Sequence, residues 1–216
     1  MRRNFKFGVG EYYHIYSRGV DKRVIFVDDA DHHHFMALLF LCNSNKRFVF
    51  RDVISDISNF DRGEELLSIG AFCLMPNHVH FLVKETNESG ISLFCQKIFT
   101  AYSMYFNKKY SRTGSLFEGA FKAKHADTDE YLKYLFSYIH LNPLKLLDPS
   151  WKENGLNKAK NDAVDFLGKY QFSSYNDYAG GDVMFKNIIK KSDFPEYFIS
   201  EGEFLDNLRD WFDYST

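Results

Sequence analysis

Met75-Pro76-Asn77-His78-Val79-His80-Phe81-Leu82-Val83 is the stretch around which the rest of the chain can be placed. Proline and asparagine are typical of tight turns, and here they separate two apolar runs, so the sequence predicts a β-hairpin. Side chains alternate between the two faces of a strand. His78, His80 and Leu82 should therefore point to one side of the second strand, and Val79, Phe81 and Val83 to the other.

The two histidines of this strand are candidate metal ligands. Two imidazoles that are two residues apart on one face can converge on a single cation, but such a pair needs at least a third ligand. The alternative is that two histidines are merely tolerated on a half-buried strand. The stretch by itself favours neither interpretation, so the rest of the chain has to supply the third ligand.

Composition bounds the class of protein only loosely. The chain has 216 residues and a net charge of −2, so it suits one domain with an appendage, and its overall charge does not predict a nucleic-acid partner. Its distribution of charge is uneven. Residues 97–124 hold six basic side chains against one acid, whereas residues 192–216 hold seven acids against one base. This asymmetry indicates a basic working face and an acidic tail, the alternative being chance clustering on a solvated surface.

Cysteine usage and hydropathy predict a cytoplasmic protein. Cys42, Cys73 and Cys95 lie in apolar surroundings without CxxC spacing, so we expect buried thiols rather than disulfides or zinc ligands. No N-terminal run resembles a signal peptide, and no stretch is long enough to span a membrane.

The order of the predicted elements indicates an α+β, ferredoxin-like arrangement. A first strand is expected at residues 11–17, and a helix capped by Asp28 follows it. After the hairpin, a long helix is expected from Ile91 to about Tyr110, with Ser89 as its cap, and a fourth strand within residues 115–125. The order β-α-β-β-α-β is that of an antiparallel sheet with two helices on one face. Residues 46–65 fit no element and suggest an irregular insertion.

A further helix is expected to cover the face that carries the histidines. Residues 127–130 resemble a capping box, and Pro143 ends a helix that runs from about Asp129 to Leu141. We expect residues 1–148 to form the main domain, with the sheet and this helix, and residues 149–216 a mostly helical extension, loop-like between Lys152 and Asp162. Four polar residues share one side of the helix: Tyr131, Tyr134, Tyr138 and Asn142.

These residues suggest a specific chemistry. A cation held by two histidines and the neutral oxygen of Asn142 would keep open positions, which suits Mg²⁺ or Mn²⁺ acting on a phosphoryl oxygen. Tyr138 would face the same cation and could attack a phosphodiester, although a phenol with a pKa of about 10 is a weak nucleophile until a nearby charge activates it. The alternatives are a structural Tyr138 with Tyr134 as nucleophile, and an Asn142 that only caps its helix. The acidic and histidine-rich residues 28–34 look like a helix start rather than a second metal site.

At this point the chain resembles a known family. Residues 75–80 and 138–143 are similar to the two signatures of single-tyrosine HUH transposases, and the branch that fits best is that of the REP-associated tyrosine transposases. The resemblance extends over roughly Tyr12 to Tyr178. Further similar motifs are Tyr16-Ser17-Arg18-Gly19, Arg112-Thr113-Gly114-Ser115-Leu116-Phe117-Glu118-Gly119 and Ser173-Ser174-Tyr175 with Asp177-Tyr178.

The resemblance implies a function for each candidate residue. It makes His78, His80 and Asn142 metal ligands, and it makes Tyr138 the nucleophile that forms a 5′-phosphotyrosine with single-stranded DNA. The implied substrates are DNA hairpins or palindromic repeats, in a bacterial, nucleoid-associated protein. Family members with a long C-terminal extension can work as monomers, while shorter relatives pair, so a homodimer stays open. The implied contacts to DNA phosphates come from Arg18, Arg112, Lys122 and Lys124.

Two positions depart from the family pattern. Ala120 stands where an arginine is common, and Ser17 stands where an asparagine is common. Both concern DNA specificity rather than the proposed chemistry. Two other functions remain as alternatives: a non-catalytic, domesticated protein that binds palindromic DNA, and a metal-dependent phosphodiester hydrolase that uses the same histidines with water.

Overall fold

The computed structural model describes residues 6–213 and contains a four-stranded antiparallel sheet. The strands are β1 (Tyr12–Arg18), β2 (Leu67–Met75), β3 (His78–Glu85) and β4 (Lys122–His125), in the spatial order β2-β3-β1-β4. This order is that of the expected ferredoxin-like sheet, and the predicted hairpin joins β2 to β3. The α+β fold class predicted from the sequence is confirmed.

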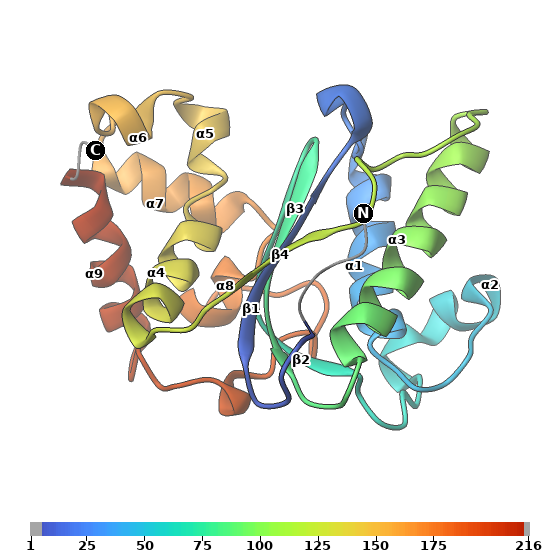
Figure 1. The fold of residues 1–216 in the computed structure, drawn as a ribbon. Coiled ribbons are helices and arrows are strands. Elements are labelled where there is room, and N and C mark those ends of the chain that lie inside the picture. Colours follow the sequence, from blue (N-terminus) through green and yellow to red (C-terminus); the bar gives the residue numbers. More distant parts are fainter. Residues whose placement is uncertain (1–5, 214–216) are drawn as a thin grey trace.

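Two helices cover one face of the sheet, α1 (Asp29–Cys42) and α3 (Gly90–Lys109) (Figure 1). Asp28 caps α1 as expected, because its side chain accepts from the backbone of Asp31 and the Asp31 side chain accepts in return. The apolar side chains of β3 point toward these helices and are fully buried in the largest core of the protein. They are Val79, Phe81 and Val83.

The start of α3 differs from the expectation. Ser89 occupies the cap position, but its side chain makes no capping hydrogen bond and its backbone is left-handed, with φ of 67°. Instead, the Glu85 carboxylate accepts from the backbone N–H of Ile91 at 2.7 Å. The end of β3 thus supplies the acceptor that the sequence assigned to Ser89.

The segment between α1 and β2 is irregular, as predicted. It holds only one short α-helix, α2 (Phe50–Val53), and a 3₁₀ segment, η2 (Ile54–Asn59). Another short 3₁₀ turn, η1 (Val20–Lys22), follows β1.

The opposite face of the sheet is covered by α4 (Asp129–His140). Thr128 caps this helix, because its hydroxyl accepts from the backbone N–H of Tyr131 at 3.2 Å. Leu82 of β3 packs with Leu135 and Ile139 of α4 in a second, smaller apolar cluster. The sequence-based expectation that a helix covers the histidine-bearing face agrees with this arrangement.

Most helices after α4 lie on the same side of the sheet as α4, whereas Phe172 and Ile188 pack against the core on the other face (Figure 1). The expectation of a loop over residues 152–162 is wrong in part, because helices cover both ends of that range. They form because Trp151, Ala163 and Leu167 are buried in a third apolar cluster, which also contains Leu141 and Leu144. The elements are α5 (Leu144–Leu147), α6 (Trp151–Asn154), α7 (Lys160–Lys169), α8 (Tyr175–Ala179), η3 (Lys191–Asp193), α9 (Glu201–Asp210) and η4 (Trp211–Asp213).

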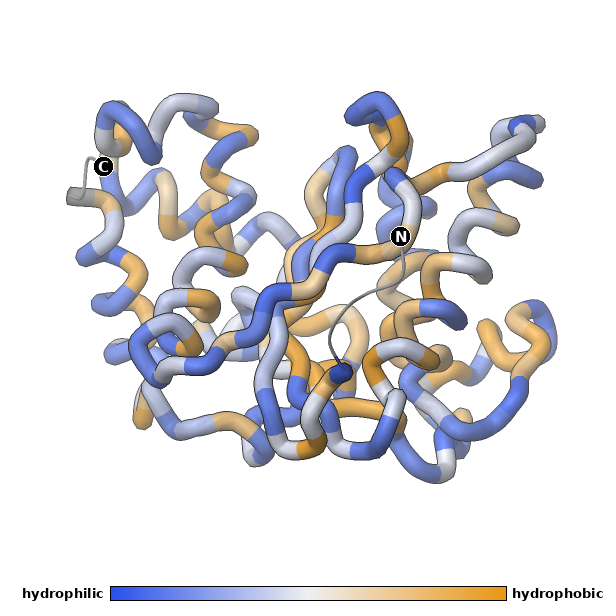
Figure 2. The backbone as a smooth tube through the Cα atoms, viewed as in Figure 1, coloured by the Kyte–Doolittle hydropathy of each residue, from blue (hydrophilic) through white to orange (hydrophobic). Residues whose placement is uncertain are grey.

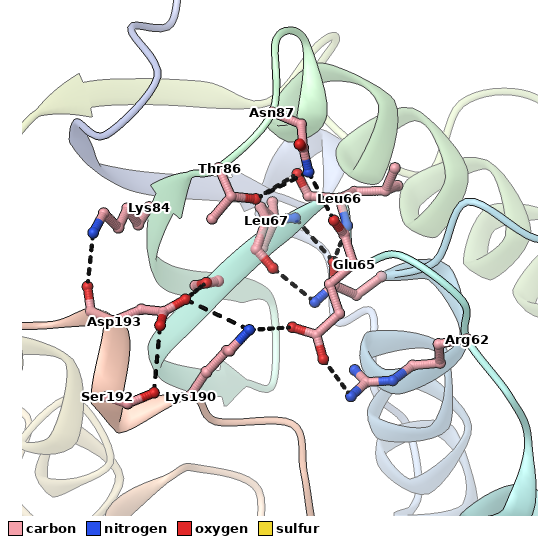
Figure 3. Close-up of polar contacts among 12 residues, drawn as sticks. Arg62, Glu65, Leu66, Leu67, Lys84, Thr86, Asn87, Lys190, Ser192 and Asp193 are labelled. Carbon is pink, nitrogen blue, oxygen red and sulfur yellow. Dashed lines mark hydrogen bonds and ion pairs between the residues drawn. The ribbon is translucent and has the colours of Figure 1, made fainter.

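The outer edge of β2 is covered by the C-terminal part of the chain. The backbone of β2 bonds to residues 172, 174 and 190 through hydrogen bonds of 2.9–3.0 Å. Beside this edge, the Lys190 ammonium lies between the carboxylates of Glu65 and Asp193, at 3.6 and 3.7 Å, and Lys84 donates to the Asp193 carbonyl (Figure 3). Residues 172–193, which we call the strap, are therefore held against the edge of β2 by main-chain hydrogen bonds and ion pairs.

Hydrophobic residues recur along the central strands, whereas β4 is mostly hydrophilic (Figure 2). The side chains of Cys42, Cys73 and Cys95 are buried, as predicted. Across residues 6–213, none of the helices has the length and apolar character needed to cross a membrane.

Candidate functional site

The face of the sheet beneath α4 gathers polar and aromatic side chains from three strands. In the strand register, His80 pairs with Tyr16, and Tyr16 pairs in turn with Lys122 of β4. His78 pairs with Arg18. Residues that are directly opposite each other on neighbouring strands point to the same face. The two histidines therefore share their face with a tyrosine and two cations.

A cavity of about 290 Å³ opens on this face. Tyr138 enters it from α4, and the centroid of its ring lies 5.6 Å from that of His80 in an edge-to-face arrangement. The structure thus brings together the phenol and the two imidazoles that the sequence singled out. The lining residues are Tyr16, Ser17, Arg18, His78, His80, Glu118, Ala120, Lys122, Tyr138 and Lys145.

Each of the two histidines has its Nδ1 atom engaged. His78 Nδ1 lies 2.6 Å from Oδ1 of Asn77, whose Nδ2 donates to the carbonyl of Lys22 at 3.1 Å. This second bond orients the amide, so its oxygen faces His78 and accepts a hydrogen bond from the Nδ1–H group. His80 Nδ1 lies 2.8 Å from Nε2 of His14. Nε2 of His78 is thereby left available to a cation, and Nε2 of His80 is available when its Nδ1 carries the proton.

Burial keeps these rings neutral, which is the form that can bind a metal. Desolvation lowers the pKa of His78 to about 4, and the charges of Arg18 and Lys145 add to the effect. Desolvation also lowers the pKa of His80 well below 6.5, and it lowers the pKa of His14 to about 4.

Tyr138 is half-buried, and its environment makes the neutral phenol the resting form. Desolvation raises the pKa of its hydroxyl above the ordinary value of 10, and the side chain of Asn142 partly offsets this. The Lys152 ammonium lies 4.1 Å from the centroid of the Tyr138 ring. Desolvation and the nearby Lys145 lower the pKa of Lys152 to about 8. The C-terminal extension therefore places a cation over the candidate nucleophile.

Asn142 lies one helical turn after Tyr138, and 1% of it is exposed. Its Nδ2 donates to the Tyr138 carbonyl at 2.8 Å, in the manner of a helix-end cap. Its Oδ1 is buried and has no hydrogen-bond partner among the described residues. Asn142 is not one of the residues that line the cavity. The orphaned oxygen is compatible with a third ligand, and that assignment stays a prediction.

The donor set fits a hard divalent cation that completes its shell with substrate. Within residues 6–213, no three His, Cys, Asp or Glu side chains form a group that could hold a metal ion. A site here would therefore consist of two imidazoles, the Asn142 oxygen and oxygens of substrate or water. Such an incomplete protein shell is typical of Mg²⁺ and Mn²⁺ sites that act on phosphates.

The four predicted DNA contacts separate into two pairs. Arg18 and Lys122 line the cavity. Arg112 does not, since it lies just after α3 and donates to Asn107 at 2.9 Å. Lys124 lies over the ring of Tyr131, with 4.0 Å between its Nζ and the ring centroid, and is also outside the cavity lining.

Sequence reasoning missed four residues of this region. His14 stands two residues before Tyr16 on β1, so strand alternation places both on one face, but its proximity to His80 depends on the strand order. Lys145 and Lys152 follow Pro143, and their positions near Tyr138 depend on the path of the chain after α4. Glu118 lines the cavity through the loop before β4, beside Ala120.

The structure thus packs a tyrosine-bearing helix over a His-Val-His strand of a ferredoxin-like sheet. A family model described as "Transposase IS200 like" matches residues 12–142, which is well over half of the chain. The chain belongs to this family, so the resemblance of the sequence motifs is confirmed.

A solved structure shares the fold. It is a REP-associated tyrosine transposase bound to a REP hairpin, matched with a TM-score of 0.50 and 13% sequence identity. The match covers 88% of this chain and 97% of the other. At this identity the similarity concerns the fold alone. Among curated proteins, the search finds no match.

Proposed function

We propose that this chain is a metal-dependent strand transferase for single-stranded DNA, which cuts and rejoins hairpin-containing DNA through a 5′-phosphotyrosine at Tyr138. The observation that carries the proposal is the convergence of Tyr138, His78 and His80 on one cavity. Membership of the IS200-like family supports the transposase activity. The REP hairpin in the structurally similar protein supports a hairpin substrate.

The cavity can hold a DNA backbone. Arg18, Lys122 and Lys145 line it, and cationic side chains that neutralise phosphates provide most of the sequence-independent affinity for DNA. Tyr16 lies among them, with Lys122 Nζ 6.0 Å from its ring centroid, and offers a surface for stacking an unpaired base.

His78 and His80, with Asn142 as third ligand, would hold Mg²⁺ or Mn²⁺. A bound cation of this kind would polarise a phosphoryl oxygen and offset the charge that develops on it. The neutral rings and the unpartnered Asn142 oxygen are the features that suit this role.

Tyr138 provides the nucleophile. Its phenol oxygen forms a bond to phosphorus while the bond to the 3′-oxygen breaks, and the proton lost by the phenol is balanced by one gained at the free 3′-hydroxyl. The ammonium of Lys152 over the ring favours the phenolate during this step. Because the phosphotyrosine keeps the energy of the phosphodiester, attack by another 3′-hydroxyl reverses the reaction and joins strands without ATP.

The test is incubation with labelled hairpin single-stranded DNA and Mn²⁺, followed by a denaturing gel. We expect a protein–DNA adduct that Tyr138→Phe abolishes. Tyr134→Phe is the matched control, because Tyr134 stacks one turn away at 5.6 Å but does not line the cavity.

Other outcomes identify the alternatives. Cut DNA without an adduct would indicate a hydrolase, and bound but intact DNA would indicate a non-catalytic binder. An adduct that survives Tyr138→Phe and disappears in Tyr134→Phe would move the nucleophile to Tyr134.

A further inference from the structure

We propose that His14 is a positioning residue that holds His80 in the tautomer and orientation that leave His80 Nε2 free to bind a divalent cation. The inference rests on the proposed function and extends it to a residue outside the HxH motif. His14 belongs to β1 and His80 to β3, and both side chains lie on the face beneath α4.

The contact between the two rings is short and buried. His14 Nε2 and His80 Nδ1 are 2.8 Å apart, and each residue is 6% exposed. The ring centroids lie 5.0 Å apart with 20° between the planes. Two nitrogens at this distance share one proton, because two protons between them would clash and none would leave two lone pairs facing each other.

The direction of this hydrogen bond decides whether His80 can be a ligand. If His80 Nδ1 donates to His14, the Nε2 lone pair of the neutral His80 ring is free for a cation. If His14 donates, the only proton of His80 sits on Nε2, and that nitrogen cannot coordinate. A cation at His80 therefore requires His14 to act as the acceptor, in the way that outer partners fix metal-binding histidines elsewhere.

His78 shows what a fixed arrangement looks like. Its partner is the amide oxygen of Asn77, which can only accept, so the tautomer of His78 has one solution. His80 has an imidazole as its partner, which can accept or donate. His14 also contacts the candidate nucleophile, since its ring centroid lies 5.7 Å from that of Tyr138. One side chain thus touches both a ligand and the tyrosine.

Mn²⁺ binding to DNA-free protein tests the role of His14. His14→Phe keeps an aromatic ring but removes the acceptor, and we expect Mn²⁺ affinity to fall by about 10–100-fold, the usual cost of losing an outer partner of a ligand. His14→Gln should retain most of the affinity, because the Gln side-chain oxygen reaches about the position of Nε2 and can accept. The matched control is His32→Phe, since His32 is 8% exposed but packs against Phe26 and Phe172, away from the cavity.

Urea unfolding of each variant establishes that it is folded. Unchanged Mn²⁺ affinity in a folded His14→Phe variant would overturn the proposal. So would an equal loss in His14→Phe and His14→Gln, because that result would mean that packing rather than hydrogen bonding is what His14 contributes.

A second measurement uses the unmodified chain. Imidazole ¹⁵N NMR of the Mg²⁺-loaded protein should show His80 with its proton on Nδ1 and none on Nε2. A proton on His80 Nε2 would overturn the proposal. Neither readout depends on DNA cleavage. If the chain binds Mn²⁺ as expected but forms no adduct, only the proposed function fails.

Discussion

The two faces of the central sheet contrast sharply, although both are built by the same strands. The face beneath α1 and α3 is apolar, and Val79, Phe81 and Val83 of β3 are fully buried there. The face beneath α4 holds the cavity, and His78 and His80 line it from the same strand. Strand alternation therefore assigns stability and chemistry to adjacent residues, and single substitutions on β3 should separate the two.

The largest loss of stability is expected from a substitution on the apolar face beneath α1 and α3. Phe81 is completely buried and its ring lies 6.2–6.3 Å from those of Phe35 and Phe94. Phe81→Ala should lower the free energy of unfolding by about 3–5 kcal/mol, because it leaves a cavity in a packed core. Urea denaturation measures this loss. An unchanged unfolding midpoint would contradict the assignment of this face to the core.

The second prediction concerns the pH dependence of stability, to which buried histidines on both faces contribute. Burial lowers the pKa of His32 and His34 on α1, and of His14 on β1, to about 4 from an ordinary 6.5. Between these values the unfolded chain binds more protons than the folded chain, so stability rises with pH. This contribution is fully present above pH 6.5 and is lost as the pH falls toward 4.

Urea denaturation across this window measures the slope. His32→Gln should flatten the slope by removing one of the contributing groups. An identical slope in His32→Gln and in the unmodified chain would show that His32 is not buried as a neutral ring.

On the polar face, His78→Ala should impair metal binding more than folding. We expect Mn²⁺ affinity to fall by more than about 10-fold, since losing even an outer partner costs 10–100-fold. The loss in stability should be only about 0.5–1.5 kcal/mol, the worth of its hydrogen bond to Asn77. Isothermal titration with Mn²⁺ and urea denaturation measure the two quantities. His125→Ala on β4 is the control, because its ring pairs with Glu11 outside the cavity.

Sequence patterns within one segment predicted the structural features that depend on that segment alone. The hairpin, the alternation of β3 and the tyrosine helix follow from turn residues, period-two spacing and a cap. His14 could not be assigned a partner, because its contact with His80 exists only once β1 has inserted between β3 and β4. The wrong cap at Ser89 has a similar cause, since Glu85 reaches the helix start from the preceding strand.

The contacts that residues after Pro143 make with the candidate site could not be predicted from sequence patterns. Lys152 lies over the ring of Tyr138 because the neighbouring Trp151 is buried in the third apolar cluster. The polar segment around Trp151 has no hydrophobic periodicity that would predict this burial. Arg112 is a similar case. Its motif suggested a DNA contact, which stays a prediction, while the pattern did not show that its side chain bonds to Asn107 beside its own helix.

The smallest effects concern the rim of the cavity. Lys145→Ala removes a lining cation and Ala120→Arg adds one, so the slope of log affinity against log salt should change by about 1 in opposite directions. Fluorescence anisotropy with hairpin DNA over a salt series measures this slope. A Tyr138→Phe background prevents cleavage during the titration. Equal slopes in both variants would place the DNA backbone elsewhere on the molecule.

The strap along β2 has a consequence for self-association. An unpaired sheet edge can accept a strand from another chain, but residues 172, 174 and 190 already bond to main-chain groups of Ile69, Phe72 and Leu74 in β2. The opposite edge offers only the four residues of β4, two of which are lysines. Two copies of this protein could therefore not pair through their β2 edges without displacing residues 172, 174 and 190. Each copy would still contain a complete cavity, because the two histidines, Tyr138 and the lining cations all come from one polypeptide.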